Sequence, residues 1–328
     1  MKPLNHLTFF YHYFNLSLAL VYVLCKTVNQ SYSLLNGRGR FLHNCLLLYI
    51  FLITYFKNMI TKINEAVDYI RRVYNVPPSV GIVLGSGLGS FTAEIKIEKE
   101  ISYGDIPHFP VSTVEGHSGK LIFGELGGKK VVAMAGRFHY YEGYHTSDVV
   151  FPIRVMKFLG VTTLLISNAA GGINTGFKVG DLMVIKDHIS LFAVNPLIGK
   201  NIEAFGPRFP DMSEPYNKAL IEKAKAIAAK KDIDLKEGVY CGVTGPTFET
   251  RAEYKLMHVL GGDAVGMSTV QEVIVAVHMG ITVFAMSVIT DIGIREEENK
   301  ITHAEVLEAA AHAEPKLTYI FKELIAQL

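Results

Sequence analysis

The chain has 328 residues, 49% of them hydrophobic, and its 32 basic and 31 acidic side chains leave a formal net charge of +1. This length can bury a large core in one α/β domain or two smaller ones. The near-neutral charge excludes a surface that coats nucleic acid, because such a surface needs a basic excess. Cys25, Cys45 and Cys241 have neither CxxC nor metal-ligand spacing, which indicates a reducing compartment and no bound metal.

The first 58 residues differ in composition from the rest of the chain. Two mostly apolar runs, residues 7–25 and 41–56, contain polar interruptions, whereas a membrane-spanning helix needs about 20 consecutive apolar residues. No small-residue cleavage site follows the first run, which argues against a signal peptide. Anchoring helices are one alternative. We interpret residues 1–58 as a hydrophobic extension, either a non-native start or poorly ordered, and expect one domain over residues 59–328.

That domain is predicted to begin with a helix and a buried strand. From residue 59 onward, apolar side chains recur at helical spacing, and residues 80–84 form a short apolar run. This strand leads into GSGLGS at residues 85–90, where glycines let backbone N–H groups approach an anion and Ser86 adds a hydroxyl. The spacing is GxGxG rather than the GxGxxG of dinucleotide sites, so we expect no nucleotide cofactor.

A predicted hairpin leads into the most polar segment of the chain. The hairpin covers residues 120–134, turns at two consecutive glycines and follows a loop that carries His117. It continues into GRFHYYEGY, where an extended backbone would place Arg137, His139 and Tyr141 on one face. Arginine offers a planar fork for a multi-oxygen anion and histidine adds a charge-sensitive hydrogen bond. The segment therefore predicts an anion site, with a solvated hairpin corner as the alternative.

The middle of the chain alternates helices and strands. We predict a helix over residues 148–158 and a buried strand over 162–167, followed by NAAGG at residues 168–172. Small residues at the carboxyl end of a strand lie where an α/β sheet opens to a ligand. Another strand is expected over residues 182–189. The proline-rich stretch 195–216 is predicted to be an irregular loop, either functional or at an interface.

A second polar cluster follows the next strand. A surface helix is predicted over residues 218–231 and a strand over 238–243, which leads into GPTFET. Glu249 could pair with the edge of a heterocyclic base while the ring of Phe248 stacks on its face. The alternative for Glu249 is to offset the dipole at the start of the predicted helix over residues 251–260.

The last third of the chain is predicted to return to the same sheet edge. The segment DAVGMST, residues 263–269, ends a short strand and opens a helix over 270–279. Residues 281–290 form a near-continuous apolar run, which is typical of a central strand, and Asp291 follows it. The closing helix carries His303 near its start. No repeat and no second domain boundary interrupt this pattern.

Eight segments, taken together and in order, resemble the trimeric class of purine nucleoside phosphorylases: GSGLGS, EGHSGK, GRFHYYEGY, SNAAGG, GPTFET, DAVGMST, SVITD and THAEV. The resemblance covers about residues 59–328. It implies one α/β domain with a central twisted mixed β-sheet flanked by helices. It also implies reversible phosphorolysis of purine (deoxy)ribonucleosides to the free base and α-(deoxy)ribose 1-phosphate. The enzyme is expected to be a cytoplasmic homotrimer. It is expected to need no cofactor, because inorganic phosphate is a co-substrate.

The resemblance assigns roles to residues at both ends of a substrate. The residues expected to bind phosphate are Ser86, His117, Arg137, His139, Ala169 through its backbone N–H, and Ser268. Those expected to bind the nucleoside are Tyr141, Phe205, Tyr240, Phe248, Glu249, Val265, Met267, Asp291 and His303. Three are expected to be catalytic, namely His139, Glu249 and Asp291. Phe205 resembles the aromatic residue that reaches into a neighbouring subunit's site.

Asp291 departs from the pattern, because many relatives carry asparagine there. An ionised carboxylate cannot donate to purine N7, so Asp291 is either protonated in the transition state or accepts from an exocyclic amine. Glu249 favours a 6-oxopurine, which has an N1–H to donate. We therefore predict a 6-oxopurine preference, with adenosine left open. A methylthioadenosine phosphorylase is one alternative, although His303 would meet its apolar 5′-thioether. A membrane-tethered nucleoside-binding protein is another.

Overall fold

The computed structural model describes residues 59–111, 113, 118–294 and 301–328. The predicted N-terminal extension and His117 lie outside the described residues. Residues Lys62–Leu328 make one compact unit. Within the described part of the chain, no helix is long and apolar enough to cross a membrane.

The elements follow the predicted alternation of helices and strands. The helices are α3 (Met59–Val73), α4 (Thr146–Val149), α5 (Phe151–Leu159), α6 (Lys218–Ala229), α7 (Arg251–Val259), α8 (Val270–His278) and α9 (His303–Ala326). The strands are β1 (Val80–Val83), β2 (Lys96–Ser102), β3 (Lys120–Leu126), β4 (Lys129–Ala135), β5 (Thr163–Gly172), β6 (Leu182–Ile189), β7 (Leu235–Gly242), β8 (Ala264–Gly266) and β9 (Thr282–Ile292). Short 3₁₀ turns cover Gly89–Glu94 (η1), Tyr103–Asp105 (η2) and Tyr140–Glu142 (η3).

Within the described residues, nine strands form one mixed sheet, which confirms the predicted fold class. Its order is β2-β3-β4-β1-β5-β8-β7-β6-β9, and β9 also pairs with β5, so that the second half closes on itself. Strands β4, β1, β5 and β9 run parallel to one another, whereas β2, β3 and β8 pair antiparallel with β3, β4 and β5. The carboxyl ends of the four parallel strands therefore meet at one edge.

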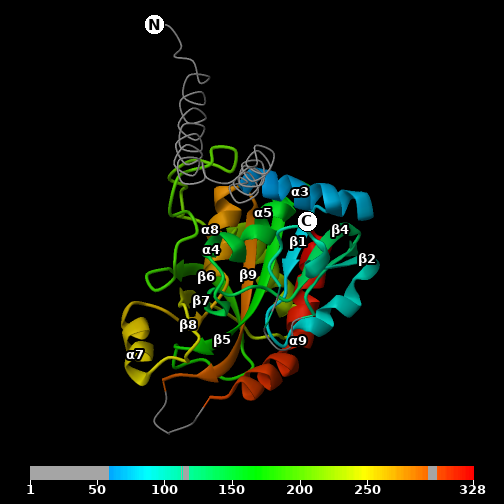
Figure 1. Cartoon of the computed structure of the whole chain (residues 1–328). Coiled ribbons are helices and arrows are strands. Elements are labelled where there is room, and N and C mark those ends of the chain that lie inside the picture. The colour runs from blue at the N-terminus through cyan, green and yellow to red at the C-terminus, as the bar shows by residue number, and fades with distance from the viewer. Residues whose placement is uncertain (1–58, 112, 114–117, 295–300) are drawn as a thin grey trace, which may run out of the picture. The chain divides into compact units, whose positions relative to one another are not determined.

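Two groups of helices cover the sheet (Figure 1). Helix α9 packs on β9 and on α6, while α5 packs against α8, which also contacts β9. Strand β1 is buried along its whole length because helices cover it. Helix α3 has the predicted amphipathic pattern, with Ile63, Val67 and Ile70 on its buried face.

The structure extends or adds strands where the sequence pattern is weak. Strand β5 continues through residues 168–172, because Asn168 to Gly172 stay paired with β9 instead of leaving the sheet. Strand β2 was not predicted, since its sequence KIEKEIS is charged and mostly exposed. It is an edge strand, and charged side chains on such a strand prevent pairing with other chains.

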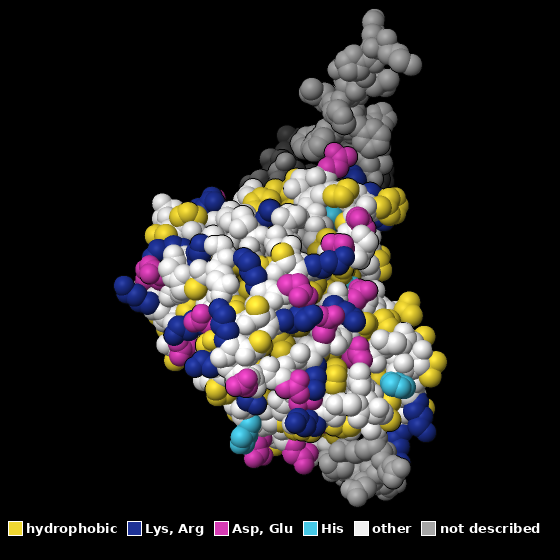
Figure 2. Space-filling model, turned by 180° about the vertical axis from the view of Figure 1, so that it is seen from behind, with side chains coloured by type: hydrophobic (Ala, Val, Ile, Leu, Met, Phe, Trp, Pro, Cys, Tyr) yellow, Lys and Arg dark blue, Asp and Glu magenta, His cyan; other side chains and the backbone are white. Residues whose placement is uncertain are grey.

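One face of the surface shows interspersed charges (Figure 2). On this face, lysine and arginine side chains are interspersed with aspartate and glutamate (Figure 2). Ion pairs of the molecule include Lys130 with Glu98 at 2.6 Å and Lys225 with Glu237 at 3.0 Å. This face has no single-sign field of the kind that nucleic-acid binding needs.

Candidate active site

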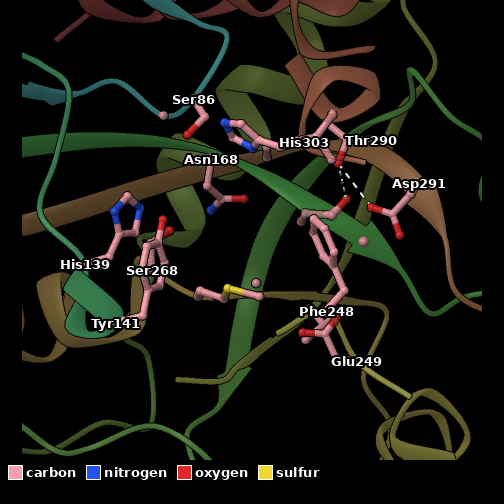
Figure 3. A pocket seen from close by; sticks show the side chains of 18 of the residues that line it. Ser86, His139, Tyr141, Asn168, Phe248, Glu249, Ser268, Thr290, Asp291 and His303 are labelled. Atoms are coloured by element: carbon pink, nitrogen blue, oxygen red, sulfur yellow. Dashed lines mark hydrogen bonds between the residues drawn. The ribbon is translucent and has the colours of Figure 1, made fainter. Parts of the chain in front are cut away.

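A pocket lies at the carboxyl ends of the parallel strands, and twelve of the predicted residues line it. These are Ser86, Arg137, His139, Tyr141, Ala169, Phe248, Glu249, Val265, Met267, Ser268, Asp291 and His303. The residues that were not predicted to line it are Gly85, Asn168, Ala170, Gly171, Tyr254, Gly266, Thr290 and Val306. Figure 3 shows His139 and Ser268 at one end and Phe248, Glu249 and Asp291 at the other.

Neighbouring strands hold the glycine loop that carries Ser86. The backbone N–H of Gly85 donates to Ser167 Oγ at 3.3 Å, and a Cβ on Gly85 would lie only 2.8 Å from Asn168 Cα. On the far side of the loop, buried Glu314 of α9 accepts from the N–H of Phe91 at 2.9 Å. The glycine at residue 85 therefore permits close approach of β1 and β5, which fixes where Ser86 enters the pocket.

Arg137 is the most buried charged group of the pocket. Its side chain is 1% exposed, its Nη1 donates to Ser268 Oγ at 2.9 Å, and its Nε lies 3.2 Å from Oε1 of buried Glu272 on α8. Burial of a guanidinium costs free energy unless a carboxylate compensates it. Glu272 supplies this charge from behind, so the guanidinium is held in place at the pocket wall. No feature of the sequence marked Glu272, because it lies inside an apolar helix.

Thr269 adopts a strained turn beside Ser268. Its φ of 70° and ψ of −54°, with a 2.7 Å hydrogen bond from the N–H of Val270 to the carbonyl of Ser268, define a γ-turn with positive φ. This conformation is rare and strained for a residue with a β-branched side chain. Asn168 Nδ2 donates to Thr269 Oγ1 at 2.9 Å and holds the turn. Such strain clusters at functional sites, and here it sets the position of Ser268.

His139 is held by a carboxylate at the same end. Its Nδ1 lies 3.1 Å from Glu142 Oε1, and its ring stacks on Tyr141 at 4.7 Å and 13°. The hydroxyl of Thr113 donates to the other Glu142 oxygen at 2.6 Å. Strand β4 ends at Ala135 and the turn η3 begins at Tyr140, so the segment that carries Arg137, His139 and Tyr141 is not one continuous strand. Arg137, His139 and Tyr141 nevertheless line one pocket, as predicted.

These contacts determine the charge state of Glu142. Burial works against the charged form, but hydrogen bonds from His139 and from the side chain and backbone of Thr113 outweigh it and lower the pKa of Glu142 from 4.5 to about 2. Glu142 is therefore ionised at neutral pH and can accept a hydrogen bond from Nδ1–H of His139.

Replacing Glu142 by glutamine is expected to make the unfolding free energy depend less on pH in the acid range. A carboxyl whose pKa is lower in the folded state stabilises the protein above its unfolded pKa, and this contribution disappears as pH falls from about 4.5 to about 2. We expect the difference in unfolding free energy between the unaltered protein and Glu142→Gln to be largest near pH 6 and to shrink toward pH 2. Urea titrations at several pH values measure it. A difference that is constant with pH would contradict the assignment.

The opposite end of the pocket combines apolar surface with two carboxylates. Val265 is buried, and the ring of Phe248 is 42% exposed. Asp291 Oδ1 accepts from the hydroxyl of Thr290 at 3.3 Å, and its Oδ2 accepts from Tyr254 at 3.2 Å. Burial raises the pKa of Glu249, and the charge of Asp291 raises it further. An apolar slot with polar groups on one rim fits a planar heterocycle.

The structure removes the alternative role proposed for Glu249. The N-cap of α7 is Thr250, and the acid of its first turn is Glu253, which forms a capping box with Thr250. Glu249 precedes the cap and lines the pocket. A capping box also fixes the start of α9, where Thr302 and Glu305 place His303 at the first helical position, facing the pocket.

Two predicted residues do not line the pocket. Phe205 is 4% exposed, and its ring packs under the Arg154 guanidinium at 4.4 Å, so the prediction that it reaches into another subunit is wrong. Sequence alone cannot choose among the aromatic residues of an irregular loop. Tyr240 is fully buried behind the pocket, where its hydroxyl accepts from the N–H of Ser268 at 3.5 Å. It supports Ser268 rather than contacting a nucleoside.

The pocket has donors suited to an anion at one end and a slot suited to a planar heterocycle at the other, which is the pattern of a group-transfer enzyme, and comparisons with known proteins agree. The profile of the phosphorylase superfamily matches residues 79–326. Purine nucleoside phosphorylase 1 of Geobacillus stearothermophilus is 48% identical over 268 residues, which cover 82% of this chain and 98% of that protein. Purine nucleoside phosphorylase of Rattus norvegicus is 50% identical over 259 residues, which cover 76% of this chain and 89% of that protein.

Solved structures show the same similarity. Schistosoma mansoni purine nucleoside phosphorylase in complex with inosine matches with a TM-score of 0.78 and 42% identity, over 82% of this chain and 97% of that one. Isoform 2 from the same organism, in complex with cytosine and ribose-1-phosphate, has a TM-score of 0.78 and 48% identity over 81% of this chain and 96% of that one. The chain belongs to the phosphorylase superfamily. Within it, the chain groups with the purine nucleoside phosphorylases, which confirms the resemblance seen in the sequence motifs.

Proposed function

We propose that this pocket phosphorolyses purine nucleosides, with phosphate at the Arg137 end and the base at the Glu249 end. The observation that carries the proposal is that one cavity joins a buried guanidinium to an apolar slot rimmed by carboxylates. Attack of phosphate on C1′ releases the free purine and forms α-ribose 1-phosphate, or its deoxy counterpart. Both substrates must be held together, since positioning converts a bimolecular reaction into a step within one complex.

At the anion end, a positive charge and several hydrogen-bond donors line the same part of the pocket. Arg137 supplies a fixed guanidinium, His139 a ring nitrogen, and Ser86 and Ser268 supply hydroxyls. We assign the backbone N–H of Ala169 to the same cradle, and His117 on the basis of its motif alone. Preorganised donors stabilise charge without reorganisation during the reaction, and each is worth about 10²–10³ in rate.

At the base end, the protein must stabilise negative charge on the departing purine. Glu249 accepts from N1–H of a 6-oxopurine, which favours inosine and guanosine over adenosine. We assign Asp291 to the N7 side of the same edge, and Phe248 and Val265 to the two faces of the ring; all three line the pocket. Removing electron density from the base promotes cleavage of its bond to C1′. Glu249, Asp291 and His139 are therefore the residues to which we assign catalytic roles.

The sugar lies between these ends in the proposed complex. We assign Tyr141 and Met267 to the ribose ring and His303 to the 5′-hydroxyl. Burial, together with the nearby Glu142 charge, raises the pKa of Tyr141 to about 12, so its hydroxyl stays protonated and can donate to the sugar. His303 is a polar neighbour for a hydroxyl, which favours a nucleoside over a 5′-thioether.

We further propose a cytoplasmic homotrimer that needs no metal or organic cofactor. Among the described residues, no group of histidine, cysteine and acidic side chains has the geometry to hold a metal ion.

Exposed apolar side chains of the irregular segment after β6 supply a surface for association: Leu191 (75% exposed), Ile198 (77%) and Phe209 (86%). Phe209 replaces Phe205 as the aromatic candidate for a contact between subunits. Sedimentation of the unaltered protein and of Phe209→Ser tests the assembly.

Product analysis tests the reaction itself. Residues 59–328 and the full chain are each mixed with inosine, with and without phosphate, and the products are separated chromatographically. We expect hypoxanthine and ribose 1-phosphate in equal amounts, and only when phosphate is present. Formation of free ribose at the same rate without phosphate would identify water as the attacking group and refute the proposal.

Replacing His139 by alanine is expected to weaken the use of phosphate without unfolding the protein. We expect kcat/KM for phosphate to fall about 10²-fold, because a preorganised donor to the anion is lost. The matched control is His258→Ala, since His258 is an exposed residue of α7 outside the pocket. Initial rates against phosphate concentration measure the change. Full activity in His139→Ala would refute the anion-site assignment.

A further inference from the structure

One tyrosine joins the two carboxylates at the base end of the pocket. Tyr254 of α7 is 3% exposed, and its hydroxyl donates to Asp291 Oδ2 at 3.2 Å. The Glu249 carboxylate approaches the same hydroxyl. A Cβ on Gly171 would lie 2.9 Å from the Tyr254 hydroxyl and 3.1 Å from Asp291 Oδ2, so a glycine in β5 leaves the space in which these groups meet. Figure 3 shows Glu249 and Asp291 at this end of the pocket.

The chemistry of a tyrosine hydroxyl allows it to serve both acids. It can donate its proton to an ionised carboxylate and accept one from a protonated carboxyl. Two carboxyl groups that share a buried site do not both ionise readily, because like charges repel and burial disfavours each charge. In agreement, burial raises the pKa of Glu249 and the charge of Asp291 adds to this, and together they outweigh the hydrogen bond from Tyr254, which lowers it. We therefore infer that Glu249 and Asp291 share one proton.

That proton has two positions, and each suits a different purine. With Asp291 protonated and Glu249 ionised, Glu249 accepts from N1–H and Asp291 donates to N7 of a 6-oxopurine. With Glu249 protonated and Asp291 ionised, Glu249 donates to N1 and Asp291 accepts from the 6-amino group of adenine. To change between them, the proton of one carboxyl moves to the Tyr254 oxygen while the hydroxyl proton moves on to the other carboxylate. One proton is relocated and nothing else changes.

We propose that Tyr254 is a specificity-determining residue, which bridges Glu249 and Asp291 so that the same pocket cleaves 6-aminopurine as well as 6-oxopurine nucleosides. This inference rests on the proposed function. It adds adenosine to the substrates, and it assigns a role to a residue that no sequence motif marked.

The contacts of Asp291 predict which substrate depends more on Tyr254. Without the bridging hydroxyl, the Thr290 hydroxyl still lies 3.3 Å from Asp291 Oδ1, and also 3.3 Å from the Ala170 carbonyl; its single proton favours the ionised form of Asp291 when it is donated there. The shared proton then stays on Glu249, which is the arrangement that suits adenine. We therefore expect Tyr254→Phe to lower kcat/KM for inosine on the order of tenfold more than for adenosine, since hydrogen bonds to charged groups are stronger than those between neutral groups.

The test compares inosine and adenosine in four variants and the unaltered protein, in the presence of phosphate. Adenosine is expected to yield adenine, which chromatography distinguishes from hypoxanthine formed by deamination. Asp291→Asn removes the charged acceptor and should lower adenosine cleavage more than inosine cleavage. Glu249→Gln should have the opposite effect, because charge-assisted hydrogen bonds are roughly twice as strong as neutral ones. The control Tyr216→Phe removes another buried hydroxyl, which contacts His188 at 3.0 Å, and should leave the substrate ratio unchanged.

The outcomes separate this inference from the proposed function. If inosine is not cleaved at all, the proposed function fails. If inosine is cleaved but adenosine yields no adenine, or if Tyr254→Phe lowers both substrates by the same factor, the bridge is refuted and Tyr254 has a packing role only. Opposite changes of the substrate ratio in Asp291→Asn and Glu249→Gln, together with the expected shift in Tyr254→Phe, support it.

Discussion

Replacing Arg137 by methionine is expected to lower kcat/KM for phosphate by about 10³-fold or more. Methionine keeps an unbranched apolar stem but is shorter and removes the charge and the donors that face the pocket, and a single preorganised donor is already worth about 10²–10³. Initial rates of inosine cleavage over a range of phosphate concentrations measure the loss. We expect most of it to appear as weaker use of phosphate.

A second variant separates charge from geometry at this position. Lysine keeps one positive charge but has no planar fork, so it cannot contact a multi-oxygen anion and Glu272 together. Arg137→Lys is therefore expected to fall between the unaltered protein and Arg137→Met. If Arg137→Lys were as active as the unaltered protein, a point charge would suffice, and the bidentate role of Arg137 would be wrong.

Replacing Glu272 by alanine is expected to destabilise the fold by about 3–5 kcal/mol, because it leaves the Arg137 guanidinium buried without its carboxylate. Both side chains are almost inaccessible, at 1% and 4%, and their atoms approach to 3.2 Å. Thermal unfolding is expected to shift down by roughly 10 °C. The control Glu222→Ala breaks an exposed pair with Lys225 and should cost about 0–1 kcal/mol.

A double variant distinguishes the cost of an unpaired buried charge from the cost of lost packing. Replacing both partners, Arg137→Met with Glu272→Met, removes the buried charges together, and apolar replacements of such pairs are often neutral for stability. We expect this variant to unfold at a higher temperature than Glu272→Ala and to remain inactive with phosphate. If the double variant were less stable than Glu272→Ala, shape rather than charge would determine the cost at this site.

The sequence predicted the parallel half of the sheet well, because buried strands there are short apolar runs that end in small or polar residues. It also grouped Arg137 with His139, and Phe248 with Glu249, since each pair lies close together in the segment that follows a strand. It missed β2, whose charged, exposed sequence has no strand pattern.

The missed site residues share a physical reason. Glu272, Tyr254 and Asn168 act through partners that are distant in the chain: Arg137, Asp291 and Thr269, at separations of 135, 37 and 101 residues. No local period or spacing reports such a contact. Phe205 failed for a related reason, because which aromatic ring of the irregular segment is buried depends on Arg154, which is 51 positions earlier.

The γ-turn at Thr269 places two demands on one position. A glycine would relieve the backbone, which has a φ of 70°, but it would remove the oxygen to which Asn168 donates. A larger side chain would keep the unfavourable φ and add bulk where the residue is 1% exposed. Neither a glycine nor a larger residue therefore improves both the backbone conformation and the contact with Asn168, so the strain at Thr269 accompanies the positioning of Ser268.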